Sequence, residues 1–411
     1  MKILIASMPA TGHVNPMLAI ARILMTDGHE VAVYTGSAFR ARVEAARAEF
    51  FSLPPDADLD PADPFARVPE LKVMSPGPAW LRIVMERVFV DNIPGQHEGL
   101  QRLLHSFGPD VIIGDDMFFG VLPMLLGRRP KRPPIVMCGT SILHWPREDG
   151  APLFVGLPPA TTPKQRHEYA AVARDFHEEV DRPVGLRLNK LLKELGAAPT
   201  SMTLFHSTVG LADAYLQLSV PGFEYPRDIP RSVRFVGTPP IIPNQVPPPP
   251  WAHELDGSRK VVLVTQGTVA NHNFGLLIAP TLAALANEPD VLVTNGGYGS
   301  VNQAMSFGIP LVTAGMTEDK ADVNARVAWS GVGVNLATNE PAQEALRAAV
   351  RTVLDRPAYR LRASQMAGEF ARIDTRSEIL SIISEVVAHH KAGLRAGTVA
   401  ISQPRRTAHQ R

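Results

Sequence analysis

The stretch "PDVLVTNGGYGSVNQAMSFGIPLV", residues 289–312, carries the clearest structural pattern in this sequence. An apolar run leads into a glycine-rich turn, a helix-like segment and a second apolar run. Strand, helix and strand form the βαβ unit of α/β proteins, in which helices cover a parallel sheet. The glycines let the backbone approach a ligand, and the helix start directs free N–H groups toward it. The stretch predicts an α/β domain with an anion-binding loop, although a plain tight turn has the same pattern.

The same alternation continues on both sides of this unit. Apolar, strand-like runs such as "KILIASM", "EVAVYTG" and "PDVIIGD" alternate with helix-like segments in the first half, and "KVVLVTQGT" opens a second series. Between them lies "VGTPPIIPNQVPPPPWAHELDGS", whose prolines exclude a helix or a central strand. We therefore predict two doubly wound, Rossmann-like domains joined by an extended linker. The predicted divisions are a first domain at 1–225, a proline-rich linker at 226–258, a second domain at 259–390 and a disordered polar tail at 391–411.

Bulk composition narrows the possible partners and locations. The 411 residues carry a net charge of +1, so no global field attracts nucleic acid or an anionic membrane. The single cysteine, Cys138, excludes a disulfide within the chain, which suits the reducing cytoplasm. No apolar run reaches the roughly 18 residues of a membrane-spanning helix. We expect a cytoplasmic monomer or weak dimer without an integral membrane segment.

A histidine at the first strand-to-helix junction is the first candidate for chemistry. The segment "NPMLAIARILMTDGHE" predicts a helix that Asn15 caps, with Pro16 in its first turn. His13 then lies in the loop "ATGHVNP" at the carboxyl end of a parallel strand, where doubly wound folds bind ligands. Histidine is the usual general base near neutral pH. A local capping or packing role for His13 is the alternative.

Two aspartates end another strand of the same predicted sheet. Asp115 and Asp116 close "PDVIIGDD", so a carboxylate there could hydrogen-bond His13 and fix its tautomer. Asp115 follows the strand directly and is preferred, and an ordinary loop aspartate is the alternative. His167 and His177 do not have metal-ligand spacing and predict a solvated helix face. We therefore predict no metal site.

At this point the sequence resembles a known family, the bacterial macrolide-type branch of the UDP-glycosyltransferases (glycosyltransferase family 1), which has the GT-B fold. The resemblance covers nearly the whole chain and is carried by "GHVNP", "PGFEYPRDIPRSVRFVG", "VLVTQGT" and "TNGGYGSVNQAMSFGIPLVTAGMTEDKADVNARV". It implies two Rossmann-like domains facing a cleft. It also implies inverting transfer of a hexose from a UDP- or dTDP-sugar to a hydroxyl of an apolar small molecule, such as a macrolide, a polyphenol or a lipid. No metal and no cofactor would be needed.

The resemblance also implies roles for single residues. His13 would take the acceptor's proton, Asp115 would orient His13, and Gly12 would lie close to the reacting groups. The donor would be held by its diphosphate, its ribose (at Gln303) and its sugar hydroxyls (at Glu318 and Asp319). The full set of implied donor-side positions is Gly12, Thr268, Asn295, Gly296, Gly297, Gly299, Ser300, Gln303, Glu318 and Asp319. Two positions depart from the family pattern, because Asn295 replaces a histidine and Lys320 a glutamine.

A larger departure lies at Pro289-Asp290. In the family, two further strands and a helix precede the glycine-rich strand, but here "TLAALANEP" passes straight into "DVLVTNGG". Roughly thirty residues, the size of a βαβ unit, are missing. In relatives that stretch holds the nucleotide base. We therefore expect a smaller second sheet in which the strands of "VVLVTQGT" and "DVLVTNGG" follow each other directly.

Three functions remain open from the sequence. The leading one is the glycosyltransferase, for which "PAWLRIVMERVFVDNIP" would supply an acceptor-pocket wall, although a plain core helix fits the same periodicity. The alternative is a catalytically impaired relative that lacks a base pocket and binds an apolar ligand only. A sugar-nucleotide epimerase of the same fold is disfavoured, because "GHVNP" matches the transferase pattern.

Overall fold

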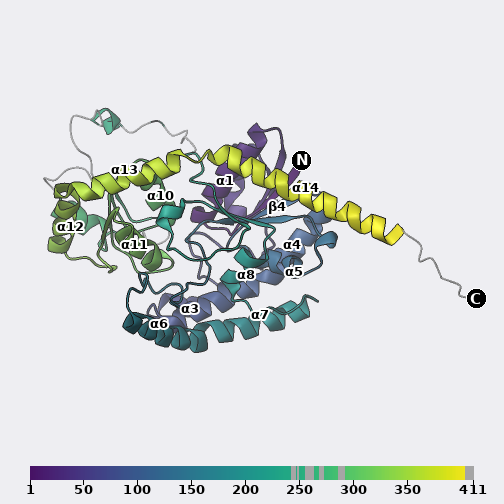
Figure 1. The fold of residues 1–411 in the computed structure, drawn as a ribbon, viewed down its shortest axis with the longest axis horizontal. Helices are drawn as coiled ribbons and strands as arrows, with labels where there is room; N and C mark the ends of the chain where they lie inside the picture. Colours follow the sequence, from purple (N-terminus) through teal and green to yellow (C-terminus); the bar gives the residue numbers. More distant parts are fainter. Residues whose placement is uncertain (242–246, 248–249, 255–262, 268–272, 286–291, 403–411) are drawn as a thin grey trace, which may run out of the picture.

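The computed structural model describes residues 1–241, 247, 250–254, 263–267, 273–285 and 292–402 of the chain. Two parallel sheets organise these residues, one of seven strands and one of four. The N-terminal half of the chain builds the first sheet and the C-terminal half builds the second. Figure 1 shows the halves beside each other, with the long helix α14 (Thr375–Ser402) passing over the N-terminal half. The predicted α/β class with two Rossmann-like units is confirmed.

The first sheet has the strand order β3-β2-β1-β4-β5-β6-β7. Its strands are β1 (Lys2–Ala6), β2 (Glu30–Thr35), β3 (Glu49–Ser52), β4 (Val111–Asp115), β5 (Ile135–Gly139), β6 (Ala214–Gln217) and β7 (Val233–Phe235). After β1 the chain adds β2 and β3 on one side, and then crosses back to add β4 on the other side. β1 and β4 are parallel neighbours that flank this switch in strand order. Doubly wound sheets bind ligands at the carboxyl ends of such a strand pair.

Both faces of the first sheet are buried. Ile3 and Ile5 lie in one core and Leu4 and Ala6 in the other, as the two-residue period of a strand requires. The helices of this half are α1 (Thr11–Thr26), α2 (Arg40–Ala45), α3 (Pro78–Ile83), α4 (Ile93–Ser106), α5 (Leu122–Leu125), α6 (Pro163–Phe176), α7 (Arg182–Glu194) and α8 (Leu204–Leu211). Two π-helical segments, η3 (Val84–Phe89) and η7 (His177–Asp181), continue α3 and α6.

The second sheet has the strand order β11-β10-β9-β8. Its elements are β8 (Leu263–Thr265), α9 (Ile278–Ala284), β9 (Leu292–Thr294), α10 (Tyr298–Ser306), β10 (Leu311–Thr313), α11 (Lys320–Trp329), β11 (Gly333–Asn335), α12 (Gln343–Asp355) and α13 (Pro357–Ala371). β8 and β9 are parallel neighbours with α9 between them in the chain, as expected for two strands that follow each other directly. Within the described ranges β8 pairs with β9 alone. Leu263, the first residue of β8, is 61% exposed.

Helix α1 begins earlier than the sequence predicted. It starts at Thr11, Asn15 does not cap it, and Pro16 lies inside it. The early start is possible because the carbonyl of Ala10 accepts the N–H groups of His13 and Val14, at 3.0 and 2.9 Å. Pro16 is the sixth residue of this helix, so the hydrogen bond that an N–H there would donate to the carbonyl of Gly12 is absent. His13 therefore lies in the first turn of a helix and not in a loop.

The C-terminal helix packs on the N-terminal sheet and not in the second domain, where the sequence placed residues up to 390. Its apolar positions recur at helical spacing and join the core that holds Ile3 and Leu216; they are Ile379, Ile382, Ile383 and Val387. The helix continues to Ser402, so residues 391–402 are helical where a polar tail was expected. Residues 403–411 lie outside the described part of the chain.

The first sheet also extends past residue 225, the expected end of the first domain. β7 pairs with β6, with Val233 opposite Tyr215, so part of the expected linker is a strand. The sequence did not predict this three-residue edge strand, because prolines surround it. Residues 242–246, 248, 249 and 255–258 of that linker, and the junction at Pro289-Asp290, fall in ranges that the structure leaves undescribed. Of the helices that it does describe, none is both long and apolar enough to cross a membrane.

Candidate active site

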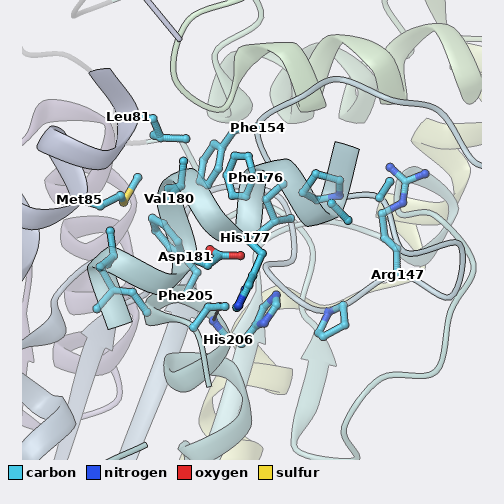
Figure 2. Close-up of a pocket in the computed structure, with 18 of the residues that line it drawn as sticks. Leu81, Met85, Arg147, Phe154, Phe176, His177, Val180, Asp181, Phe205 and His206 are labelled. Atoms are coloured by element: carbon cyan, nitrogen blue, oxygen red, sulfur yellow. Dashed lines mark hydrogen bonds between the residues drawn. The ribbon is translucent and has the colours of Figure 1, made fainter. Parts of the chain in front are cut away.

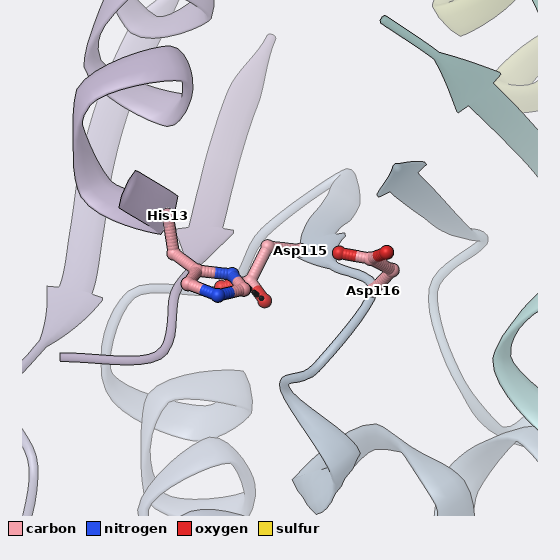
Figure 3. A group of neighbouring side chains, drawn as sticks. All are labelled: His13, Asp115 and Asp116. Carbon is pink, nitrogen blue, oxygen red and sulfur yellow. Dashed lines mark hydrogen bonds and ion pairs between the residues drawn. The ribbon is translucent and has the colours of Figure 1, made fainter. Parts of the chain in front are cut away.

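The candidate site lies where β1 and β4 end. His13 follows β1 in the first turn of α1, and Asp115 is the last residue of β4. Because the two strands are parallel neighbours, their carboxyl ends bring these residues together although 102 positions separate them. Figure 3 shows the ring of His13 against the carboxylate of Asp115, with Asp116 turned away from it. The structure thus places Asp115, the preferred of the two aspartates, beside His13.

The hydrogen bonds around His13 define its tautomer. Nδ1 lies 3.0 Å from Asp115 Oδ1 and 3.0 Å from the hydroxyl of Thr140. The Thr140 hydroxyl donates its own proton to Asp116 Oδ1 at 2.8 Å, so it can only accept from the imidazole. Nδ1 therefore carries a hydrogen. No residue in the described ranges hydrogen-bonds Nε2, and the side chain of His13 is 18% exposed.

Asp115 is fully buried and held by the backbone. Its oxygens accept hydrogen bonds from the N–H groups of Met8, at 2.6 Å, and Met117, at 2.9 Å. Burial lowers the pKa of His13, but the charge and hydrogen bond of Asp115, together with the charges of Asp116 and Asp319, outweigh this and raise the pKa to about 9. The site therefore stabilises the imidazolium form, which is what a proton-accepting histidine becomes.

Asp116 belongs to a second, connected set of contacts. It accepts from Thr140, and its other oxygen lies 3.4 Å from Nδ1 of the buried His144, an ion-pair distance without hydrogen-bond geometry. Burial raises the pKa of Asp116, but His144, the charge of His13 and the Thr140 hydroxyl hold it below its ordinary value. Asp116 thus contacts His13 indirectly, through the hydroxyl of Thr140.

Ligand atoms of His13, Asp115 and Asp116 lie within 4.8 Å of one another, so a small cation is geometrically conceivable there. Each carboxylate already accepts two or more hydrogen bonds from the protein, and Nδ1 of His13 donates. A cation would have to displace these bonds. These three side chains therefore suit a hydrogen-bonded general base better than a metal site.

The glycine-rich loop lies at the carboxyl end of β9. Gly296 has φ +91°, and a Cβ there would meet the Asn324 amide of α11. Asn295 is buried, and its Nδ2 donates to the carbonyl of Gln266. α10 begins at Tyr298, directly after the loop. The predicted loop-to-helix geometry is therefore present, with Gly296 as the position that requires glycine.

The start of α10 is open to a ligand. A Cβ at Gly297 or Gly299 would meet no atom within 4 Å, and Ser300 and Gln303 are exposed one turn apart on the same face. The same holds for Gly12 at the start of α1, which is exposed and has open space beside it. Thr268, the remaining predicted donor-side residue, lies in a range that is not described.

Of the acidic pair that precedes α11, Asp319 reaches the N-terminal half. Ser141 donates to Asp319 at 2.5 Å. Burial raises the pKa of Asp319, although Ser141 and the charges of His144 and His13 oppose the shift. Glu318 has φ +57° and forms an ion pair with the buried Lys320, whose pKa burial lowers to about 8. Asp319 thus faces the His13 side of the site, whereas Glu318 is exposed.

Sequence reasoning missed three polar residues at this sheet edge. Thr140 and Ser141 follow β5, and Gln217 ends β6 and donates to the hydroxyl of Tyr298 at 2.6 Å. A signal existed, because each of them follows or ends a parallel strand, as Asp115 does. The partners of Ser141 and Gln217 in the C-terminal half could not be predicted from local patterns.

A cavity of about 240 Å³ opens in the N-terminal half. Figure 2 shows its mainly apolar lining, which comes from η3, η7, α8 and the loop around Phe154. Leu81 and Met85 of the expected acceptor wall line it, whereas Val84 and Val88 of the same segment lie in a hydrophobic core. One face of the segment thus lines the cavity, and another belongs to the core.

Polar groups in the cavity are few. Burial raises the pKa of Asp181 to about 6, although the nearby His177 opposes the shift. Burial lowers the pKa of His206 to about 4, and the charges of His144 and Arg227 act in the same direction. The cavity is therefore an apolar chamber with one weakly acidic carboxyl group.

Comparisons with known proteins show what this chain is similar to. Residues 277–386 match the family described as "Erythromycin biosynthesis protein CIII-like, C-terminal domain". The chain is 34% identical to 4'-demethylrebeccamycin synthase from Lentzea aerocolonigenes, over 94% of this chain and 99% of that protein. It is 32% identical to UDP-glycosyltransferase 2 from Phaeomoniella chlamydospora, over 94% and 96%.

Solved structures show the same fold at lower identity. The calicheamicin glycosyltransferase CalG4 superimposes with a TM-score of 0.67 at 19% identity, over 94% of this chain and 98% of that one. The kitacinnamycin glycosyltransferase gives a TM-score of 0.68 at 18% identity, with 94% and 98% covered. The chain therefore belongs to the UDP-glycosyltransferase family of natural-product glycosyltransferases and has the GT-B fold.

Proposed function

We propose that the protein transfers a hexose, with inversion, from a UDP- or dTDP-sugar to a hydroxyl group of an apolar small molecule, and that His13 is the general base. The observation that carries this proposal is the His13–Asp115 pair at the β1–β4 switch. The protein fixes the Nδ1 side of the His13 imidazole, which leaves Nε2 to act on a substrate. Asp115 would hold the tautomer and stabilise the imidazolium.

The reaction is a single displacement. The acceptor oxygen forms a bond to the anomeric carbon while the bond from that carbon to the diphosphate oxygen breaks, and the acceptor's proton moves to His13 Nε2. The negative charge that develops on the diphosphate is stabilised by N–H groups at the start of α10, beside Gly297 and Ser300. In this proposal Gln303 contacts the ribose, and Asp319 accepts a hydrogen bond from the sugar.

The apolar cavity is the acceptor site in this proposal. Its aromatic and aliphatic lining suits an apolar natural product, and the name of the relative 4'-demethylrebeccamycin synthase supports the same class of acceptor. The cavity wall adjoins the His13 site, because the ring centroid of Phe205 lies 4.7 Å from that of the buried His144, whose Nδ1 lies 3.4 Å from a carboxylate oxygen of Asp116. His13 does not line the cavity, so in this proposal the acceptor's reacting hydroxyl extends beyond the cavity to reach it.

One observation favours the alternative, an impaired relative without a base pocket. The alignment with 4'-demethylrebeccamycin synthase spans 426 positions, more than the 411 residues of this chain, so part of that relative has no counterpart here. Among the described residues, the four-stranded sheet ends at β8. A donor would then be held by its diphosphate and sugar alone.

Calorimetry and turnover separate these functions. UDP-glucose and dTDP-glucose are titrated against the protein, with inorganic diphosphate as a ligand that lacks the base. Turnover is then measured on flavonoid and macrolide acceptors, with His13→Ala and, as the matched control, the exposed His105→Ala. We expect His13→Ala alone to lower kcat by at least ~10²-fold.

Two results would overturn the proposal. Absence of UDP- and dTDP-sugar binding at ~1 mM would exclude an active transferase, since such binding corresponds to only about −4 kcal/mol. Nucleotide sugars that bind no more tightly than diphosphate would support the alternative instead. An unchanged rate in His13→Ala would exclude His13 as the base.

A further inference from the structure

Helix α11 carries a charged stripe that faces the N-terminal half. Asp319, Asp322 and Arg326 are spaced by three and four residues, which places them on one face of the helix. Asp319 accepts a hydrogen bond from Ser141, and the buried Arg326 forms an ion pair with Glu224, at 3.1 Å. Three successive contacts on one helix face therefore join the donor-side helix to the acceptor-side half.

The middle contact is a clamp on a loop. Asp322 is only 2% exposed, and its two carboxylate oxygens each accept one backbone hydrogen bond. The N–H of Phe154 donates to Oδ2 at 2.6 Å, and the N–H of Gly156 donates to Oδ1 at 2.8 Å. Hydrogen bonds to a charged acceptor are the strong ones, and here both belong to the same short loop.

The clamped loop has an unusual backbone. Phe154 has φ +68° and Gly156 has φ +67°. A bulky residue rarely adopts this left-handed conformation, and it persists only where its surroundings impose it. A Cβ at Gly156 would lie 3.0 Å from the carbonyl oxygen of Ala321, so the loop also packs directly on α11. Asp322 supplies the electrostatic part of that constraint.

The side chain of Phe154 forms part of the acceptor cavity. It lines the cavity, and its ring centroid lies 5.3 Å from that of Phe205 and 5.9 Å from that of His144. Figure 2 shows Phe154 at the cavity with Phe176 beside it. The backbone conformation that Asp322 holds therefore decides where this wall of the cavity stands.

We propose that Asp322 is a positioning residue that shapes the acceptor cavity from the donor side, by holding Phe154 in its left-handed conformation through two backbone hydrogen bonds. The role in turnover rests on the proposed glycosyltransferase function, whereas the effect on the cavity does not. Docking of α11 against the N-terminal half and formation of the acceptor site are then one event. Asp322 touches neither substrate.

The variant Asp322→Asn tests the clamp. It preserves size, but one oxygen becomes an NH₂ group that cannot accept a hydrogen bond. The matched control is Asp355→Asn, at the exposed end of α12. Hydrogen exchange followed by mass spectrometry should show the amides of 154–156 exchanging at least ~10-fold faster in Asp322→Asn alone, as the loss of a charged hydrogen bond implies. Unchanged protection of this loop would overturn the proposal.

Binding of a neutral apolar fluorophore, N-phenyl-1-naphthylamine, tests the cavity without any turnover. The variant Met85→Trp fills the cavity. The fluorescence that this variant loses relative to the wild type is therefore the signal from the cavity. We expect Asp322→Asn to weaken this binding roughly tenfold, the effect of about 1.4 kcal/mol. Exchange that becomes faster without weaker binding would refute the positioning role. A signal that Met85→Trp does not reduce would also refute it, because the cavity would then hold no ligand.

Turnover supplies the readout that a merely structural role would not move. In Asp322→Asn the KM for the acceptor should rise roughly tenfold, while the KM for the donor and kcat change less than about twofold. An equal loss in both KM values would overturn the proposal. If the wild type shows no turnover with any acceptor, only the proposed function fails, and the fluorophore measurement decides the inference.

Discussion

The His13–Asp115 pair yields a prediction that does not depend on knowing the substrates. The change is Asp115→Asn, which keeps the size of the side chain but removes the charge beside the imidazole and leaves one oxygen to accept the bonds that Met8 and Met117 donate to two. Because the charge and hydrogen bond of Asp115 are the largest of the effects that raise the pKa of His13, we expect this pKa to fall.

The size of the effect follows from the raised pKa. The site holds the pKa of His13 at about 9, against 6.5 for an ordinary histidine. At about 1.4 kcal/mol per pKa unit, this difference corresponds to about 3 kcal/mol of preference for the imidazolium in the folded state. Most of it should vanish in Asp115→Asn, where burial continues to lower the pKa. The histidine should then titrate below about 7.

Proton NMR of the histidine rings measures this directly. His13→Gln identifies the resonance of His13, and the exposed Asp27→Asn is the control for removal of a carboxylate elsewhere. In the wild type the resonance should shift with a midpoint near 9. A midpoint near 6.5 in the wild type would refute the effect of Asp115 on the pKa of His13, and so would an unchanged midpoint in Asp115→Asn.

Stability and rate should follow the same titration. A pKa that is raised in the folded state adds stability that is complete below pH 6.5 and is lost as the pH rises through about 9. The unfolding free energy of the wild type should therefore fall by about 3 kcal/mol relative to His13→Gln between pH 6 and pH 9.5. If His13 is the base, kcat/KM should rise with pH up to about 9, because only the neutral imidazole accepts a proton. A rate that is already flat above pH 7 would contradict this.

Three further predictions test other parts of the molecule. Asp181→Asn should raise the unfolding free energy by about 1–2 kcal/mol at pH 7.5 but not at pH 4, measured by thermal melts, because burial raises the pKa of this carboxyl to about 6 and its charged form is therefore unfavourable. Glu224→Gln should cost about 3–5 kcal/mol in urea unfolding, since Arg227 and Arg326 would both lose the carboxylate they share; a cost under about 1 kcal/mol would show that the cluster is dispensable. Gly296→Ala should abolish binding of nucleotide sugars in calorimetry while leaving the His13 titration unchanged, because the added Cβ would collide with an amide side chain of α11 at a backbone angle that disfavours alanine.

Much of the fold was predictable because it follows from local patterns. Apolar runs alternating with helical segments indicated parallel sheets, and the prolines near residue 240 separated the two series. The expectation that β8 and β9 are neighbours also followed from adjacency in the sequence. The predicted start of α1 was wrong. A cap at Asn15 was expected, but the helix begins earlier, where backbone N–H groups bond to the Ala10 carbonyl.

The candidate site was predictable in part, for a topological reason. His13 and Asp115 both lie at the carboxyl ends of parallel strands, so a doubly wound sheet brings them to one edge whatever their distance in the chain. The glycine-rich loop was recognisable because Gly296 must adopt a positive φ. The same rule applies to Thr140, which follows β5, but only the structure shows that its hydroxyl joins His13 to Asp116.

The sequence alone determined the α/β alternation and the family, because both depend on residue types in a local order, and it favoured Asp115 as the partner of His13. The tertiary structure decided which elements meet. Only it packed α14 onto the N-terminal sheet, opened the cavity beside Phe154 and turned one face of α11, with Asp322, toward that loop. Such contacts join residues more than a hundred positions apart, and their geometry is set by the packing of whole helices and sheets, which no local pattern encodes.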